Sequence, residues 1–144
     1  MLIIGYGNTL RGDDGIGCVA AEELSKKVKD KRIQVVSCQQ LTPELAKDVS
    51  EADRVILIDA MRGKPSGHLV MRRISPGDVQ PTFTHELRPE SLLACSRELY
   101  GACPETFLVS ITGHSFKLGE EISQQLIGLL PKLNRYVLKL ANVH

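Results

Sequence analysis

The stretch that decides the expected fold of this chain is GYGNTLRGDDGIG, residues 5–17. It follows an apolar run, residues 1–4, and precedes a helical pattern, so it predicts a turn between a buried strand and a helix. Its glycines permit a tight backbone path, and Asp13 and Asp14 fall where that path becomes a helix. In open α/β folds such a turn lies at the carboxyl edge of the sheet, where ligands bind. We therefore expect the functional site at this turn.

Spacing excludes two common nucleotide-binding loops. The dinucleotide fingerprint needs a third glycine where this chain has Leu10, and a phosphate-binding loop needs a Gly-Lys-Ser/Thr run, which does not occur. Asp13 and Asp14 would also repel a phosphate from the helix N-terminus that normally attracts it. The stretch therefore indicates a loop that faces a cation, although aspartates at a helix start also serve as caps.

Composition narrows the classes of partner. The chain has 144 residues, which fits one domain spanning 1–144 with a core of its own. With 18 basic and 17 acidic residues the net charge is +1, so we expect no extended nucleic-acid or anionic-membrane surface. No excess of apolar residues indicates an interface, so a monomer is expected.

The cysteines and the start of the chain indicate the compartment. The four cysteines include no C-x-x-C pair, which argues against a structural zinc site or a redox dithiol. No secretion signal or run of ~20 apolar residues is evident, so a cytoplasmic protein is expected. In a reducing compartment each cysteine is expected to be a small buried residue.

Strand and helix patterns alternate along the whole chain. Apolar runs predict buried strands at 1–6, 33–38, 55–58 and 107–111. An imperfect alternation predicts a further strand at 68–74, for which an antiparallel position near an edge is open. Amphipathic patterns predict helices at 13–30, 43–52, 89–100 and from 122 onward. Thr42 is expected to cap the second helix, and Pro131 to bend the last one or to start its second part. The expected fold is α/β, a three-layer α/β/α sandwich around a mostly parallel sheet of about five strands.

Three polar residues stand at loops that this topology could bring together. Asp14 follows the first strand, Asp59 ends the third, and His85 lies in the long irregular stretch 75–88. Two carboxylates and an imidazole suit a divalent ion such as Ni, Mn, Fe, Co or Zn, with positions left open for an external ligand. Sequence spacing leaves open whether the three meet, because a lone loop histidine is often a surface residue.

The sequence resembles the maturation endopeptidases of [NiFe] hydrogenases, and the resemblance covers nearly the whole chain. The matching pieces are Gly5-x-Gly7-Asn8-x-Leu10-x-x-Asp13-Asp14-Gly15-x-Gly17, Ile58-Asp59-Ala60, Thr84-His85 followed by Leu92-Leu93, and the region 113–123 with Gly119. Many members of the family carry Gly-Thr-x-Gly where this chain has Gln40-Leu41-Thr42-Pro43-Glu44. At this stretch the chain is more similar to the branch of the family that serves soluble, bidirectional NAD(P)-coupled hydrogenases.

The resemblance implies a narrow activity. These enzymes remove a C-terminal extension from the hydrogenase large-subunit precursor after nickel insertion. By the family's pattern, Asp14, Asp59 and His85 meet a nickel that arrives with the substrate and is not a resident cofactor. Gly7, Asn8 and Asp13 would then support the loop, with Asp13 at the helix start or behind the ligands.

The chemistry leaves alternatives open. No serine or cysteine has an evident base beside it in the sequence, so we expect water as the nucleophile, with a carboxylate or His85 assisting proton transfer. A hydrolase with its own resident divalent metal is one alternative, and a nickel-binding assembly factor that does not cut is another. Among the other histidines, His114 could line the substrate groove, whereas His68 is expected at the surface.

Overall fold

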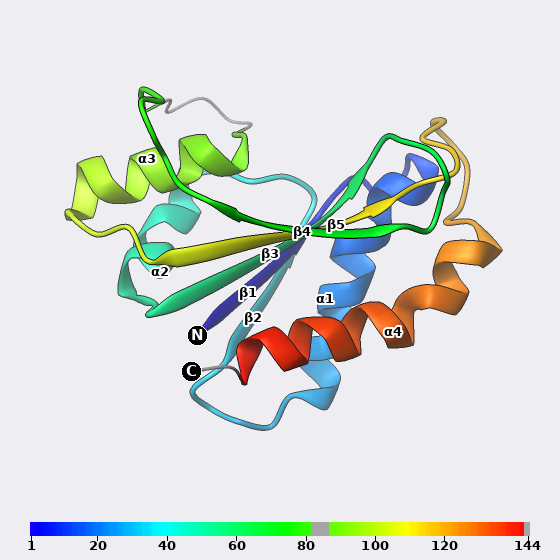
Figure 1. Ribbon diagram of the computed structural model, residues 1–144, viewed down its shortest axis with the longest axis horizontal. Helices are drawn as coiled ribbons and strands as arrows, with labels where there is room; N and C mark the ends of the chain where they lie inside the picture. The colour runs from blue at the N-terminus through cyan, green and yellow to red at the C-terminus, as the bar shows by residue number, and fades with distance from the viewer. Residues whose placement is uncertain (82–86, 143–144) are drawn as a thin grey trace.

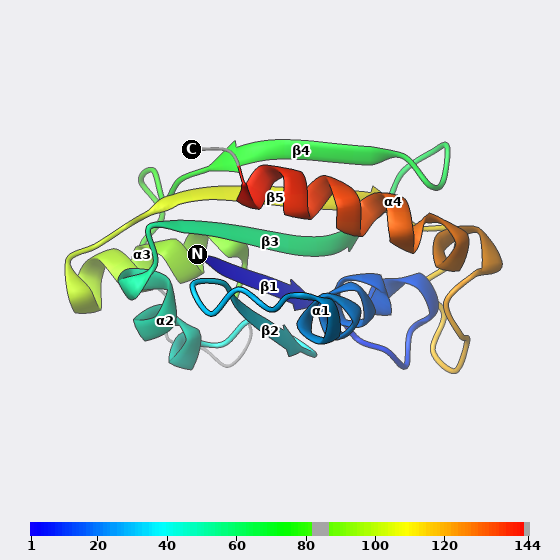
Figure 2. The same cartoon turned by 90° about the horizontal axis from the view of Figure 1, so that it is seen from below.

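Five strands form one mixed sheet in the computed structural model, which describes residues 1–81 and 87–142 (Figure 1). The strands are β1 (Leu2–Tyr6), β2 (Gln34–Cys38), β3 (Arg54–Met61), β4 (Leu69–Ile74) and β5 (Glu105–Thr112). They lie in the order β2-β1-β3-β5-β4, with β4 and β2 at the two edges (Figure 2). Every neighbouring pair is parallel except β4 with β5. The predicted mostly parallel sheet with an antiparallel edge strand is thus confirmed.

Helices cover both faces of the sheet. They are α1 (Ile16–Lys27), α2 (Ala46–Glu51), α3 (Pro89–Tyr100) and α4 (Gln124–Ala141), with short 3-10 turns η1 (Gly12–Gly15) and η2 (Pro43–Leu45). Figure 1 shows α1 and α4 on one face of the sheet and α2 and α3 on the other. Successive residues of a strand point to opposite faces of the sheet. In β1, Leu2 and Ile4 pack toward α2 and α3, while Ile3 packs toward α1 and α4. This explains why the strands are continuous apolar runs.

Several element boundaries differ from those expected. The first helix begins as η1 and ends at Lys27, three residues before Asp30. Thr42 precedes η2, but its side chain makes no capping hydrogen bond, so that prediction is wrong. Pro131 lies within one continuous helix, α4, whose start is capped by the Ser123 hydroxyl. Local patterns located each element, whereas packing set the ends.

The cysteines only partly follow their expected burial. Cys18 and Cys95 are buried, Cys38 is half-buried and Cys103 is exposed. Cys103 lies in the connection between α3 and β5 and belongs to neither element.

None of the described helices is long and apolar enough to cross a lipid bilayer.

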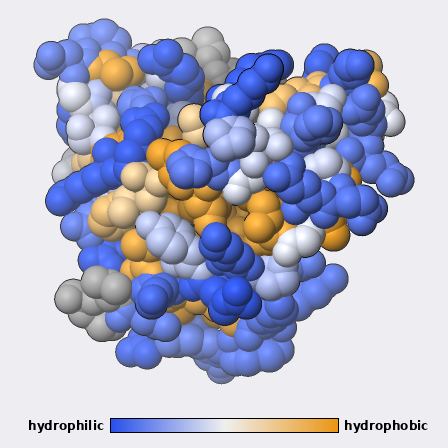
Figure 3. Space-filling model, turned by 45° about the vertical axis from the view of Figure 1, so that its right-hand side comes forward, coloured by the Kyte–Doolittle hydropathy of each residue, from blue (hydrophilic) through white to orange (hydrophobic). Residues whose placement is uncertain are grey.

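Apolar surface gathers at the centre of the face shown in Figure 3, with hydrophilic side chains around it. An open groove lined in part by Leu69, Tyr136 and Leu138 exposes such side chains beside α4. Apolar atoms make up more than half of an ordinary protein surface, so this groove alone does not define an interface. The expectation of a monomer stays a prediction.

Helix α1 packs directly against the backbone of the sheet where it starts, because Gly5 and Gly17 lie at this contact. A Cβ atom on Gly17 would collide with the carbonyl oxygens of Ile58 and Tyr6, and one on Gly5 would collide with the Gly17 carbonyl. These are backbone atoms of β1, β3 and α1, which cannot move aside independently. The two glycines therefore fix the position of η1 above the carboxyl ends of β1 and β3.

We expect Gly17→Ala to lower the free energy of unfolding by about 2 kcal/mol, because the added methyl group overpacks a rigid contact. Gly128→Ala is the matched control, since Gly128 lies in α4 with open space around its Cβ position. There the change should raise stability by about 0.5–1 kcal/mol through helix propensity. Urea denaturation of the two variants and the wild type measures both effects, and equal values for the variants would contradict the close contact.

Candidate active site

Two carboxylates that are far apart in the sequence line one cavity at the carboxyl edge of the sheet. Asp59 lies near the end of β3, and Asp14 lies in η1, which follows β1. Strands β1 and β3 are adjacent, with Gly5 opposite Ile58. The cavity has a volume of about 210 Å³ and is lined by Tyr6, Gly7, Asp14, Gln39, Gln40, Leu41, Asp59, Ala60 and Leu87. The structure thus brings together two of the three site residues that the sequence suggested.

The third of these residues, His85, lies outside the described residues, and Leu87, two positions later, lines the cavity. Within the described parts of the chain, no three histidine, cysteine, aspartate or glutamate side chains group closely enough to hold a metal ion. The ligand set of Asp14, Asp59 and His85 therefore stays a prediction.

Asp59 is held by two hydroxyl donors. The Tyr6 hydroxyl donates to Oδ2 at 2.8 Å, and the Ser110 hydroxyl donates to Oδ1 at 2.6 Å. Burial nevertheless raises the pKa of Asp59 above its usual range, and the nearby Asp14 charge also raises it. The two hydrogen bonds and the Arg72 charge act to lower this pKa, but they do not outweigh burial. A carboxyl group of this kind can carry a proton at a higher pH than an exposed aspartate.

Asp14 is held by the loop that precedes it. The Asn8 backbone N–H donates to Asp14 Oδ2 at 2.9 Å, while the Asn8 side chain accepts from the Leu10 backbone N–H. Gly7 has φ +149°, and a Cβ there would collide with the Asp14 carbonyl oxygen. Among the described residues, nothing donates to Asp14 Oδ1. This oxygen is therefore available to a ligand in the cavity.

Asp13 has a different position from its neighbour. It is buried and does not line the cavity. Its carboxylate accepts the backbone N–H of His114 at 2.6 Å and of Ser123 at 2.7 Å, together with the Ser123 hydroxyl at 3.1 Å and a longer contact from Ser115. Asp13 therefore ties the segment 113–123, which follows β5, to the first loop, and it does so from behind the cavity.

The sequence did not single out Tyr6, Ser110, Gln39 or Gln40 as site residues. Ser110 carried a signal that could have been used, since it is a polar residue within the apolar strand β5. Gln39 bonds the first loop, because its side chain accepts from the Thr9 backbone N–H at 3.2 Å. His68 is exposed, as expected, and His114 is exposed but lines a neighbouring groove and not this cavity.

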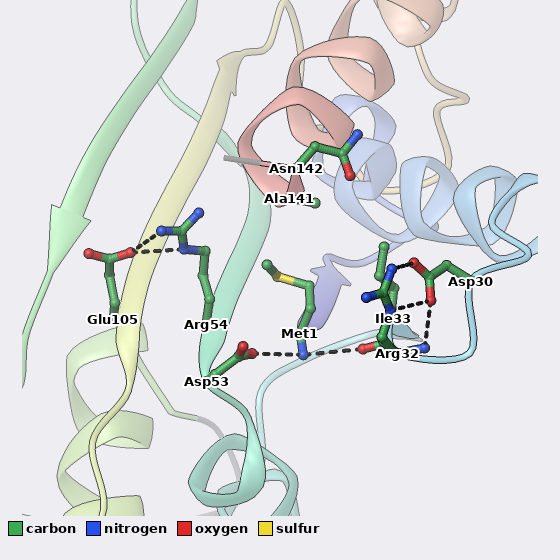
Figure 4. A pocket seen from close by; sticks show the side chains of 9 residues that line it. All are labelled: Met1, Asp30, Arg32, Ile33, Asp53, Arg54, Glu105, Ala141 and Asn142. Carbon is green, nitrogen blue, oxygen red and sulfur yellow. Dashed lines mark hydrogen bonds and ion pairs between the residues drawn. The ribbon is translucent and has the colours of Figure 1, made fainter. Parts of the chain in front are cut away.

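A cavity of similar volume lies at the opposite edge of the sheet (Figure 4). Its charges pair with each other: the Met1 ammonium contacts Asp53 at 3.0 Å, and Arg54 contacts Glu105 at 2.7 Å. Arg54 and Glu105 begin β3 and β5, so this is the amino edge. Ligands of open α/β sheets bind at the carboxyl edge, which favours the cavity of Asp14 and Asp59 as the functional site.

This geometry defines a class of protein: an α/β sandwich in which two acidic side chains converge at the carboxyl edge of the sheet. Solved structures with the same fold include a [NiFe] hydrogenase maturation protease HycI from Thermococcus kodakarensis, at a TM-score of 0.77 and 24% identity over 96% of this chain and 90% of that one. The hydrogenase maturating endopeptidase HybD from E. coli also matches at a TM-score of 0.77, with 21% identity over 96% of this chain and 90% of that one.

A hydrogenase 2 maturation peptidase from a Thaumarchaeota archaeon matches at a TM-score of 0.75, with 24% identity over 99% of this chain and 98% of that one. The chain therefore has the fold of the hydrogenase maturation proteases, over almost the full length of each. Scans of the chain against protein-family models and against curated proteins find no match.

The Asp13 contacts predict a loss of stability when its charge is removed. We expect Asp13→Asn to lower the free energy of unfolding by about 3 kcal/mol, because the amide NH₂ would face backbone N–H groups that need an acceptor. Asp78→Asn, in an exposed loop, should change it by no more than about 0.5 kcal/mol. Urea denaturation measures both, and a mild effect of Asp13→Asn would show that the buried carboxylate does not hold the segment 113–123.

Asp59 should make stability depend on pH. Its pKa is raised in the folded chain, so ionising it costs stability as the pH rises through that raised pKa. Asp59→Asn removes this cost and should be more stable than the wild type at pH 7. The advantage should shrink as the pH falls through the raised pKa and should be gone below the ordinary aspartate pKa of about 3.9, where Asp59 is protonated in both the folded and the unfolded chain. Urea denaturation between pH 3 and 8 tests this, and an advantage independent of pH would contradict it.

Proposed function

We propose that this chain is an endopeptidase that removes the C-terminal extension of a [NiFe]-hydrogenase large-subunit precursor after nickel insertion. The observation that carries the proposal is the convergence of Asp14 and Asp59 on one cavity, in a fold shared with hydrogenase maturation proteases. The two aspartates belong to the sequence pieces that resemble this family. The activity is thus supported by fold, by motif and by the placement of two site residues.

The nickel in this proposal belongs to the substrate. Carboxylate oxygens and an imidazole nitrogen are suitable donors for Ni²⁺, and a site with few protein ligands leaves room for ligands from the precursor. Asp14 Oδ1 is free of hydrogen-bond donors among the described residues, and Asp59 has one further lone pair on each oxygen besides those used by Tyr6 and Ser110. His85 is proposed as the nitrogen donor on the sequence resemblance alone.

The proposed chemistry is hydrolysis by water. A divalent ion held between precursor and enzyme would locate the scissile bond and polarise its carbonyl group. Asp59 is proposed as the proton acceptor, because burial raises the pKa of its carboxyl group and so makes its carboxylate a stronger base than that of an exposed aspartate. Tyr6 and Ser110 fix the orientation of the carboxylate during this transfer.

The intact mass of a nickel-loaded large-subunit precursor should fall by one C-terminal peptide on incubation with this protein, while nickel-free precursor should keep its mass. Precursors from several hydrogenases, including a soluble NAD(P)-coupled one, form the substrate panel. Cleavage with and without nickel would retain the protease and reject the nickel requirement. An unchanged mass for every nickel-loaded precursor would reject the protease and favour a nickel-binding assembly factor.

Site variants extend the same assay. Asp14→Ala, Asp59→Ala and His85→Ala should each lower the cleavage rate by about 100-fold or more, the usual contribution of a group that assists proton transfer or positions the reacting centre. Thermal melting serves as the folding control, and unimpaired cleavage by any variant would remove that residue from the site. Metal analysis of the desalted protein distinguishes substrate-borne nickel from a resident ion. Nickel that arrives with the substrate should be absent from the desalted protein, whereas a resident ion should remain bound to it.

A further inference from the structure

A second groove opens at the same edge of the sheet as the proposed active site. It has a volume of about 630 Å³ and is lined by Arg62, Gly63, Lys64, Pro65, Ser66, Gly113, His114 and Phe116. Residues 62–66 directly follow β3, the strand that carries Asp59, and 113–116 follow its neighbour β5. We call it the basic groove, because the described residues that line it include Arg62, Lys64 and His114 but no aspartate or glutamate.

The cationic side chains of the basic groove lack carboxylate partners within residues 1–81 and 87–142. Among the described residues, neither Arg62 nor Lys64 takes part in a salt bridge, and both are exposed. The Arg62 guanidinium lies over the Phe116 ring, 4.8 Å from its centre, which restrains the side chain without reducing its charge. At the opposite edge of the sheet, by contrast, Arg32 pairs with Asp30 and Arg54 pairs with Glu105.

The wall of the basic groove is held in place before any ligand binds. The Thr112 hydroxyl donates to the Pro65 carbonyl at 2.7 Å, and the Gly67 N–H donates to the Thr112 carbonyl at 2.7 Å. On the other side, the Ser66 hydroxyl donates to the Gln125 side chain at 2.6 Å, and that side chain donates back to the Ser66 carbonyl at 3.1 Å. A preformed wall lowers the entropy lost on binding.

We propose that the basic groove binds an acidic stretch of the precursor that lies next to the bond to be cut. This inference rests on the proposed function and adds a rule for substrate choice. Arg62 is three residues beyond Asp59, so the two are at most roughly 10 Å apart along the chain. An extended peptide covers that distance in about three residues. The acidic side chains therefore belong about three to four residues from the scissile bond.

Charge reversal on both partners tests the proposal. With a precursor that the wild type cleaves, Arg62→Glu combined with Lys64→Glu should lower kcat/KM by about 10-fold at low salt, mainly through KM, because exposed charges act on association. Arg135→Glu combined with Lys139→Glu on α4 is the matched control and should leave kcat/KM unchanged. Raising the salt concentration should narrow the difference between wild type and the groove variant.

Rescue distinguishes charge recognition from damage to the loop. Replacing acidic residues near the scissile bond of the precursor with lysine should slow the wild type and restore the groove variant. Equal cleavage by wild type and groove variant, or a loss without rescue, would overturn the proposal and leave the protease intact. If the wild type cleaves no nickel-loaded precursor, the proposed function itself fails, and the basic groove loses its occupant.

Discussion

The hydrogen bonds to the buried Asp13 carboxylate are the interaction on which the architecture of the carboxyl edge depends. One side chain accepts from three backbone N–H groups and one hydroxyl in the segment 113–123. It thereby joins the loop after β1 to the loop after β5, although β3 lies between these two strands. Because a buried carboxylate needs its donors, the two loops have one favourable arrangement. The cavity and the basic groove lie on this joined surface.

Two consecutive aspartates do different work because the chain turns between them. Asp13 points into the protein and is satisfied by backbone donors, whereas Asp14 lines the cavity with one oxygen free of donors among the described residues. Across the cavity, Asp59 is satisfied by two hydroxyl groups but remains costly to ionise. A structural carboxylate thus supports the pair of carboxylates that line the cavity. The charge imbalance at this edge also contrasts with the paired charges at the opposite edge.

Fold likeness and sequence resemblance support the proposed function in different ways. The three solved structures described above share at most 24% identity with this chain. At that level of identity their likeness shows the fold of the chain and not its activity. The residues of the first loop and Asp59 are what connect the chain to the chemistry of the family, since a fold alone can host many activities. The departure at residues 40–44 falls beside the cavity, where Gln40 and Leu41 form part of the lining. If the proposed function holds, this departure from the family pattern is placed where it could affect which precursor is cleaved.

The sequence by itself determined the order of strands and helices along the chain and the place of Asp14 and Asp59 after two of the strands, because apolar runs and glycine turns are local signals. The antiparallel direction of the edge strand β4 was only one possibility from the sequence, and the sheet decided it. The sequence could not show that Tyr6 and Ser110 donate to Asp59, since the two residues come from β1 and β5, on either side of β3, and meet Asp59 only when the sheet forms. The raised pKa of Asp59 and the neighbouring basic groove likewise follow from burial and strand order. Long-range packing decides these features, and spacing along the chain does not encode it.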